Sequence, residues 1–140
     1  MSAEQNKSIV RRWVEEGWNK GNAALIDELF TPNFYQHETG PETVNSREAL
    51  KPFYAGYLSA FPDLQFTIDD LVAEGDRVVW RFTASGHQNG PLMGAPASGK
   101  AISVTGTITF CLENSRMAEA WLNLDVLGLL QQVGIIPVAA

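Results

Sequence analysis

The sequence predicts one α+β domain in which N-terminal helices pack in a strongly curved antiparallel sheet and a short helix ends the chain. Three observations predict this fold class. Apolar residues recur at helical spacing up to residue 61, the period changes to two between residues 64 and 124, and helical spacing returns at residue 126. The length of 140 residues is enough for one core, and no linker or repeat divides it. Residues 1–140 are therefore expected to form a single domain.

The first two helices are expected to form a hairpin. Ser2 and Gln5 have the spacing of a capping box before the first helix, and Gly21 is the expected end of that helix. Asn22 is expected to cap the second helix, which Thr31–Pro32 would end. The apolar residues at helical spacing in these two helices are Ile9, Val10, Trp13, Val14, Trp18, Leu25, Ile26, Leu29 and Phe30.

A third helix is expected after a short extended piece, Phe34–His37, and a loop, Glu38–Asn45. Ser46 is the expected cap of this helix, which carries a broad apolar stripe. Pro52 lies inside the helical pattern. Regular helix is therefore expected either to begin nearer Leu50 or to be distorted in its first turn.

Four strands are expected where apolar and polar residues alternate, joined by two tight turns and one long loop, Gln88–Lys100. These connections predict an antiparallel meander. Strands of this length cannot stay flat, so Gly106 is expected at a bend or bulge. A last helix is expected over Val126–Val133, with Gly134 as its end. The expected strands are Leu64–Ala73, Arg77–Gly86, Ala101–Leu112 and Met117–Leu124.

Composition and charge exclude several classes of function. Sixteen acidic and ten basic residues give a net charge of −6, the wrong sign for binding nucleic acid or an anionic lipid surface. The single cysteine, Cys111, excludes an internal disulfide, and with His37 and His87 it gives no set of ligands for a metal. No segment has the length or character of a membrane span or a signal peptide, so a cytoplasmic protein without membrane contact is expected. Four Trp, three Tyr and seven Phe indicate a pocket or an interface.

A set of short segments accompanies this order of elements. They are Trp18–Asn22, Ile26–Phe30, Phe34–His37, Ala60–Leu64, Ala73–Val79, Gly94–Pro96, Ser98–Lys100, Trp121 and Asp125–Gly134. In order and spacing they resemble the SnoaL-like polyketide cyclase family of the nuclear transport factor 2-like superfamily, over nearly the whole chain. The resemblance implies a cone-shaped α+β barrel with a pocket.

Asp125 is the first candidate catalytic residue, because the resemblance implies a general acid/base aspartate in this motif. Glu119, Trp121, Asn123 and Asp125 share one face of a strand with period two, and we interpret that face as a pocket wall. The alternative is that Asp125 caps the last helix. The two roles need opposite environments, since backbone N–H groups lower the pKa of a carboxyl whereas apolar surroundings raise it.

His37 is the second candidate catalytic residue, because the resemblance implies a histidine in the pocket after Phe34. The alternative for His37 is an exposed or internally bonded side chain at a strand end. His87 is expected to be exposed beside the long loop. The side chains expected to bind substrate are Trp121, Asn123, Tyr57, Met93 and Trp80.

The long loop contains Gly94–Lys100, which matches most of a phosphate-binding loop. Ala101 stands where such a loop has a hydroxyl, and a strand pattern follows instead of a helix, so we reject that interpretation. The loop is expected to form a hairpin over the mouth of the barrel, with Met93 as a lid contact. Cys111 stands about where the resemblance implies an assisting histidine, and a structural or interfacial role is expected for it.

The function predicted first is a cofactor-independent enzyme that acts on a small to medium apolar carbonyl compound. Asp125 would remove a proton next to a carbonyl group and return it to the alkoxide after an aldol-type ring closure, or catalyse an isomerisation. A nearby donor, His37 or Asn123, would stabilise the enolate. No metal is expected to take part.

Two other functions stay open. One is a non-catalytic module for apolar-ligand binding or dimerisation, in which alternate residues of Ser103–Thr109 and the tail Ile135–Val138 join a homodimer. The other is a hydrolase resembling limonene epoxide hydrolase, which would need Arg81 between two carboxylates. On the interpreted strand faces, Glu119 is the acid available to it.

Overall fold

The computed structural model describes residues 2–37 and 44–138, so most of the loop expected at Glu38–Asn45 lies outside the described residues. The elements are α1 (Ala3–Arg12), the π-helical segment η1 (Trp13–Trp18), α2 (Leu25–Leu29), β1 (Phe30–His37), α3 (Arg47–Ala60), β2 (Gln65–Phe66), β3 (Asp70–Glu74), β4 (Arg77–His87), β5 (Ala101–Glu113), β6 (Arg116–Leu124) and α4 (Val126–Gln132).

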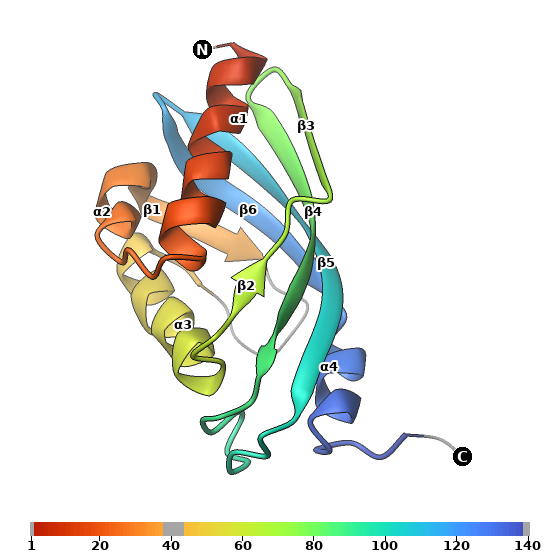
Figure 1. Cartoon of the computed structure of the whole chain (residues 1–140). Coiled ribbons are helices and arrows are strands. Elements are labelled where there is room, and N and C mark those ends of the chain that lie inside the picture. Colours follow the sequence, from red (N-terminus) through yellow and green to blue (C-terminus); the bar gives the residue numbers. More distant parts are fainter. Residues whose placement is uncertain (1, 38–43, 139–140) are drawn as a thin grey trace.

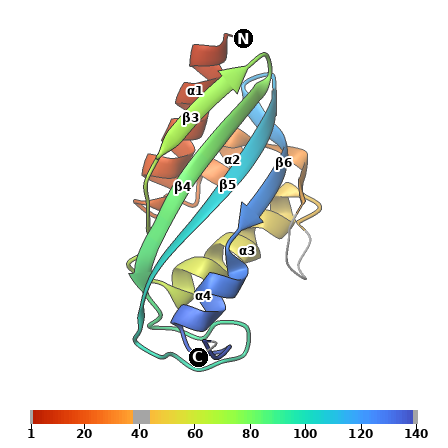
Figure 2. The ribbon, with the colours of Figure 1, turned by 90° about the vertical axis from the view of Figure 1, so that its right-hand side faces the viewer.

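The helices and the sheet form two layers. Figure 1 shows α1, α2 and α3 on the concave side of a strongly curved sheet. Figure 2 shows the opposite face, where α4 lies across the lower end and the other described helices are behind the sheet. The predicted α+β class, with N-terminal helices in a curved sheet and a short C-terminal helix, is confirmed. No helix in the described part of the chain is long and apolar enough to cross a membrane.

The sheet is mixed and not wholly antiparallel, which corrects the prediction. Its strands lie in the order β1-β6-β5-β4-β2, and β3 also pairs with β4. β1 pairs with β6 in parallel, with His37 opposite Trp121, whereas the other pairs are antiparallel. A parallel pair needs a long crossover, and here the crossover includes most of the sheet. Tight turns in the sequence cannot indicate such a pairing.

The N-terminal helices follow the sequence signals in part. The Ser2 hydroxyl accepts a hydrogen bond from the backbone N–H of Gln5, and the Gln5 side chain accepts one from the N–H of Ser2, so the capping box is confirmed. The expected cap at Asn22 is wrong. α2 begins at Leu25 with no side-chain cap, and only the backbone carbonyl of Asn22 accepts a bond from that residue. Because β1 already begins at Phe30, α2 ends before the proline.

The third helix begins at its expected cap. The Ser46 hydroxyl accepts a hydrogen bond of 3.0 Å from the backbone N–H of Ala49. Helix starts directly at Arg47 and contains Pro52, so it does not begin nearer Leu50. Arg47 donates to two backbone carbonyls around the end of α2, at 3.2 and 3.3 Å, and thereby fixes α3 against the start of β1.

The expected strand Leu64–Ala73 is two strands. The side chains between β2 and β3 explain the break, because Thr67 donates to the Asp69 carboxylate at 2.8 Å and Thr83 of β4 donates to the same carboxylate at 2.7 Å. These hydroxyl groups, Thr83 first, lower the pKa of Asp69. The backbone N–H groups of Thr67 and Asp69 also donate bonds of 2.9 Å to carbonyls of β4, so the segment stays attached to β4 without forming a regular strand.

Of the two features expected at Gly106, a bend or a bulge, the bulge is wrong. Gly106 keeps continuous register, opposite Phe82 in β4 and Leu124 in β6, and the shift in register lies between Cys111 and Leu112. The close contacts of Gly106 described below give the reason for a glycine at this position.

The connection between β4 and β5 forms the expected hairpin. Leu92 and Ala95 exchange two backbone hydrogen bonds of 2.9 and 3.0 Å around Met93 and Gly94, whose φ angles are +49° and +82°. Positive φ at both central residues is typical of a type I′ turn. β5 follows the loop directly at Ala101, which agrees with rejecting a phosphate-binding loop.

Candidate functional site

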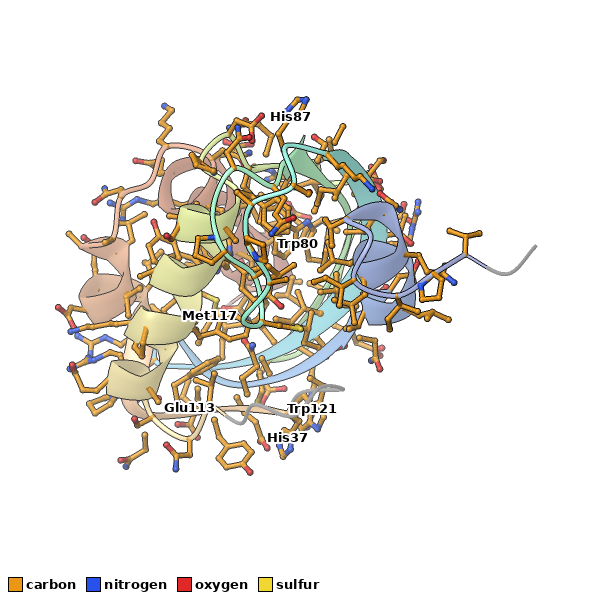
Figure 3. The ribbon with its side chains drawn as sticks, turned by 90° about the horizontal axis from the view of Figure 1, so that it is seen from below. His37, Trp80, His87, Glu113, Met117 and Trp121 are labelled. Atoms are coloured by element: carbon orange, nitrogen blue, oxygen red, sulfur yellow. The ribbon has the colours of Figure 1, made fainter. Side chains whose placement is uncertain are left out.

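An apolar cavity lies between the helices and the concave face of the sheet. It encloses about 730 Å³ of space free of atoms, including the part that is open to solvent. The cavity has room for several water molecules. Figure 3 looks into the molecule from below and shows Trp80 between α3 and α4. We take this cavity as the candidate site.

The sheet wall of the cavity is built by alternation. Side chains two residues apart in a strand lie on the same face, and the inward faces of β4, β5 and β6 are apolar throughout. The inward residues that line the cavity are Trp80, Phe82, Ala84, Ile102, Val104, Ile108, Phe110, Leu122 and Leu124.

The helical wall depends on the π-helical segment. Trp13 and Trp18, at its two ends, both line the cavity, with ring centroids 5.8 Å apart. The buried Tyr54 hydroxyl donates a hydrogen bond of 2.6 Å to the carbonyl of Gly17, and burial raises the pKa of this phenol. Short π-helical turns frequently occur at functional sites. Here the turn brings two indoles onto one wall.

Asn19 connects this wall to the sheet. Its side-chain amide donates to the carbonyl of Phe66 at 2.9 Å and accepts from the N–H of Phe66 at 2.8 Å, so it pairs with β2 as a neighbouring strand would. The ring of Phe66 then packs against Trp18, Trp80 and Phe82, with centroids 5.1 to 5.3 Å apart. No role was predicted for Asn19 from the sequence.

The polar groups of the cavity are few and uncharged. Gln36 is 4% exposed and is the amide side chain among the described lining residues. Tyr57 contributes a phenol, and the indole N–H of Trp80 donates to the carbonyl of Thr67 at 3.2 Å. None of the described lining residues is an aspartate, glutamate, histidine, lysine or arginine. The cavity therefore suits an uncharged molecule.

Asp125 is exposed and caps α4. Its carboxylate accepts a hydrogen bond of 2.9 Å from the N–H of Gly128 and is not among the groups that line the cavity. The interpretation of its strand face as a pocket wall is wrong, because Leu122 and Leu124, on the opposite face of β6, form that wall. Asp125 is next in the chain to Leu124, which lines the cavity.

Trp121, Asn123 and His37 lie on the outer face of the sheet, so the expectation that they line the pocket is wrong. Figure 3 shows His37 and Trp121 at the edge of the molecule, away from Trp80. The His37 ring is stacked on Trp121 at 5.2 Å and 8°, and its Nε2 lies 2.7 Å from a carboxylate oxygen of Glu119. The guanidinium of Arg77 lies 5.0 Å from the centre of the Trp121 ring.

The remaining predicted residues divide between cavity and surface. Tyr57 and Trp80 line the cavity as expected. Met93 does not line it, and its side chain is 55% exposed at the tip of the long loop. His87 is exposed as expected, and its Nδ1 lies 2.7 Å from the carboxylate of Asp63. This contact lowers the pKa of Asp63.

The groups needed for the hydrolase alternative do not meet. Arg81 is paired with Asp70 on the outer face at 2.6 Å, and Glu119 is paired with His37. Cys111 also lies outside the cavity, with its Sγ 3.5 Å from a carboxylate oxygen of Asp76. The pKa of this thiol is raised, mainly by burial and then by its contact with the Asp76 carboxylate. Within residues 2–37 and 44–138, no cluster of three or more His, Cys, Asp or Glu could hold a metal ion.

Alternation along β1 explains the error at His37 and would have identified Gln36. Phe34 is fully buried, so a residue two positions later must lie on the same inward face. That residue is Gln36, and His37 takes the outer face with Tyr35. The amide side chain of the cavity is thus one position before the histidine that the resemblance implied.

Comparisons with known proteins agree with this fold. The family model of SnoaL-like polyketide cyclases matches residues 8–133. A solved structure from Jannaschia sp. CCS1, whose name proposes a SnoaL-like polyketide cyclase, is 28% identical over 96% of this chain and 95% of its own, with a TM-score of 0.89. TsrD from Streptomyces laurentii is 31% identical over 97% of this chain and 99% of its own, with a TM-score of 0.86. AclR from Streptomyces galilaeus, whose name proposes a hydroxylase, is 26% identical over 99% of this chain and 87% of its own, with a TM-score of 0.87. No protein with a curated description matches significantly.

Proposed function

Because the chain belongs to the SnoaL-like polyketide cyclase family, we propose that its aromatic cavity binds a small to medium, uncharged and flat carbonyl compound. The observation that carries the proposal is the lining of the cavity, which is aromatic and aliphatic with two uncharged polar side chains, Gln36 and Tyr57. Aromatic walls favour flat ligands, and an amide or phenol donor suits a carbonyl oxygen. A charged ligand would lose its hydration without gaining a charged partner.

Binding of the fluorescent naphthyl ketone 6-propionyl-2-dimethylaminonaphthalene tests this function. The ketone is uncharged and flat, and its emission moves to shorter wavelength in apolar surroundings. We expect the ketone to bind the wild-type protein and to show this shift. The bound ketone is also expected to quench the tryptophan emission of the protein, since Trp13, Trp18 and Trp80 line the cavity. Ala84→Leu would fill the cavity and is expected to weaken binding at least about tenfold.

A neighbouring substitution on the other face of the same strand is the control. Ser85 follows Ala84 in β4 and is exposed. Ser85→Leu adds a side chain of the same size outside the cavity and is expected to leave the ketone affinity within about twofold. If both variants weaken binding equally, the ketone binds outside the cavity. If its emission does not move to shorter wavelength with the wild-type protein, the proposed function is wrong.

We also propose a homodimer joined through the outer face of the sheet, with the tail expected to take part. The supporting observation is that single large apolar side chains are exposed on the two outermost strands and in the tail, namely Tyr35 in β1, Val72 in β3 and Val138. Native mass spectrometry of the same preparations is expected to show two chains, each with one ketone bound. A single chain at all concentrations would remove the dimer and leave ligand binding untouched.

Acid/base catalysis by Asp125 is a second candidate function. The supporting observation is its place between two lining residues, directly after Leu124 and at the cap of the helix that contributes Leu129. For this reaction the Asp125 carboxylate, which is exposed and bonded to the N–H of Gly128, must turn past Leu124 toward the cavity. It then takes a proton from the carbon next to the carbonyl, and the enolate carbon attacks a second carbonyl of the same molecule. The protonated carboxyl then gives the proton to the resulting alkoxide.

Two substitutions separate a base from a cap. Asn and Asp cap helices about equally well, so Asp125→Asn keeps the cap and removes the base, whereas Asp125→Ala removes both. The assay is deuterium uptake by the methyl group of 2-acetonaphthone in heavy water, followed by mass spectrometry. Asp125→Asn is expected to lower the enzymatic exchange rate at least about tenfold, with unfolding free energy within about 0.5 kcal/mol of wild type.

Asp125→Ala is expected to lose exchange and also about 1 kcal/mol of stability, measured by urea unfolding. Wild-type exchange rates in Asp125→Asn would remove the base and leave the cap. That result would leave the non-catalytic form of the first proposal in place.

A further inference from the structure

An aromatic ring occupies the place of a missing side chain in the middle of the sheet wall. Gly106 faces the cavity, because Val104 and Ile108, two residues to either side in β5, both line it. A Cβ atom at Gly106 would lie 2.4 Å from Cζ of Phe82 and 2.9 Å from its Cε1. No side chain fits at this position unless that ring moves.

Space explains this glycine, and backbone conformation does not. Gly106 is outside the left-handed region and keeps regular pairing with both neighbouring strands. Phe82 lies opposite it in β4, is buried, and packs against the ring of Trp80 with centroids 4.8 Å apart. An aromatic ring that covers a glycine on the next strand is a known stabilising pair in sheets. Here the covering ring is also part of the cavity wall.

The helical wall contains the same arrangement. A Cβ atom at Gly17 would lie 2.2 Å from Cε3 of Trp13, another ring that lines the cavity. The backbone there is held by the hydrogen bond from Tyr54 to the carbonyl of Gly17. Two glycines, one on each side of the cavity, therefore leave room for the rings of Trp13 and Phe82.

We propose that Gly106 is a specificity-determining residue, which sets the largest ring system that the cavity accepts by letting Phe82 lie against β5. The inference rests on the proposed ligand binding. A Cβ atom at position 106 would also lie 2.9 Å from the backbone carbonyl oxygen of Asn123 in β6, so β5 has no room to move away from Phe82, and a small shift of β6 accompanies any side chain here, with or without Phe82. The ring of Phe82 must turn toward the cavity instead. Large ligands then lose affinity while small ones keep it.

A series of methyl aryl ketones with one, two and three fused rings tests the proposal. Acetophenone, 2-acetonaphthone and 2-acetylanthracene are all uncharged and flat, and their affinities follow from displacement of the fluorescent naphthyl ketone. Gly106→Ala is expected to leave acetophenone within about twofold of wild type and to weaken 2-acetylanthracene at least about tenfold. Phe82→Leu is expected to favour the three-ring ketone instead.

The double variant identifies the cause. In Phe82→Leu the ring is gone, so adding Gly106→Ala is expected to change the affinity for 2-acetylanthracene by less than about threefold. Thr107→Ala, at the adjacent residue on the outer face, is the matched control and is expected to leave all three affinities unchanged. Thermal unfolding of each variant checks that the affinities refer to folded protein.

The outcomes separate the size role from ligand binding itself. The size role is wrong if Gly106→Ala weakens the binding of all three ketones equally. It is also wrong if Gly106→Ala lowers the affinity for 2-acetylanthracene by the same factor with and without Phe82. If Gly106→Ala does not fold, the remaining two variants decide. The size role is wrong if both Phe82→Leu and the double variant have the wild-type ratio of affinities for the three-ring and the one-ring ketone. A wild-type protein that binds none of the three ketones would overturn the proposed function.

Discussion

Replacing Phe30 with alanine is expected to lower the free energy of unfolding by about 3–5 kcal/mol. Phe30 is 1% exposed and lies where η1, β1 and β5 meet. Its ring packs edge-to-face on Trp13 at 4.9 Å and on Phe34 at 4.8 Å, and approaches Phe110 at 6.5 Å. Alanine would remove three aromatic contacts at once. Urea unfolding, followed by circular dichroism and tryptophan fluorescence, measures the loss.

A second aromatic residue of β1 is the control for this prediction. Tyr35 is 38% exposed on the outer face, so Tyr35→Ala is expected to cost at most about 1 kcal/mol. Phe30→Leu, which keeps most of the apolar volume, is expected to fall between the two alanine variants. A cost of less than 2 kcal/mol for Phe30→Ala would mean that the region around this ring collapses without it, contrary to the packing described above.

Gln88→Ala is expected to lower the free energy of unfolding by about 2–3 kcal/mol and to loosen the long loop. Gln88 is 1% exposed. Its side-chain N–H group donates to the carbonyls of Gly90 and Pro96 at 3.0 and 3.2 Å, and its oxygen accepts from the N–H of Ser98 at 3.2 Å. Alanine leaves these three backbone groups without their partner. Urea unfolding measures the loss, and hydrogen exchange at Ser98 is expected to become faster.

Asn89→Ala is the matched control for the loop, because Asn89 is the next residue and is exposed. It is expected to change stability by less than about 0.5 kcal/mol. If Gln88→Ala and Asn89→Ala behave alike, the hydrogen bonds of Gln88 do not hold the loop.

The elements with local signals could be predicted from the sequence. The capping box at Ser2, the cap at Ser46 and the long alternating segments each depend on residues that are close in the chain. The parallel pairing of β1 with β6 could not be predicted in this way. It joins residues about 85 positions apart, as in Phe30 opposite Met117, and no turn between them specifies it.

The candidate site was harder to predict for a different physical reason. Alternation tells which residues share a face but not which face is inward, and β6 carries large apolar side chains on both. Trp121 is stabilised outside by His37 and Arg77, while the smaller Leu122 and Leu124 face the cavity. In β1 the ambiguity was smaller, since the buried Phe34 already indicated Gln36. Size and aromatic character alone were the wrong guides to the inward face.

The parallel contact between the first and the last strand of the chain also determines when the cavity can exist. β6 lies between β1 and β5 in the sheet, so the strand that pairs with β1 along its length in the described part of the chain is missing until residues 116–124 are available. During synthesis on the ribosome, the early aromatic residues leave the exit tunnel well before the strand that completes their enclosure. Pairing over such a long separation is slow, and an unpaired strand is prone to association with other chains. The nascent chain therefore depends on residues 116–124 to protect residues 30–37.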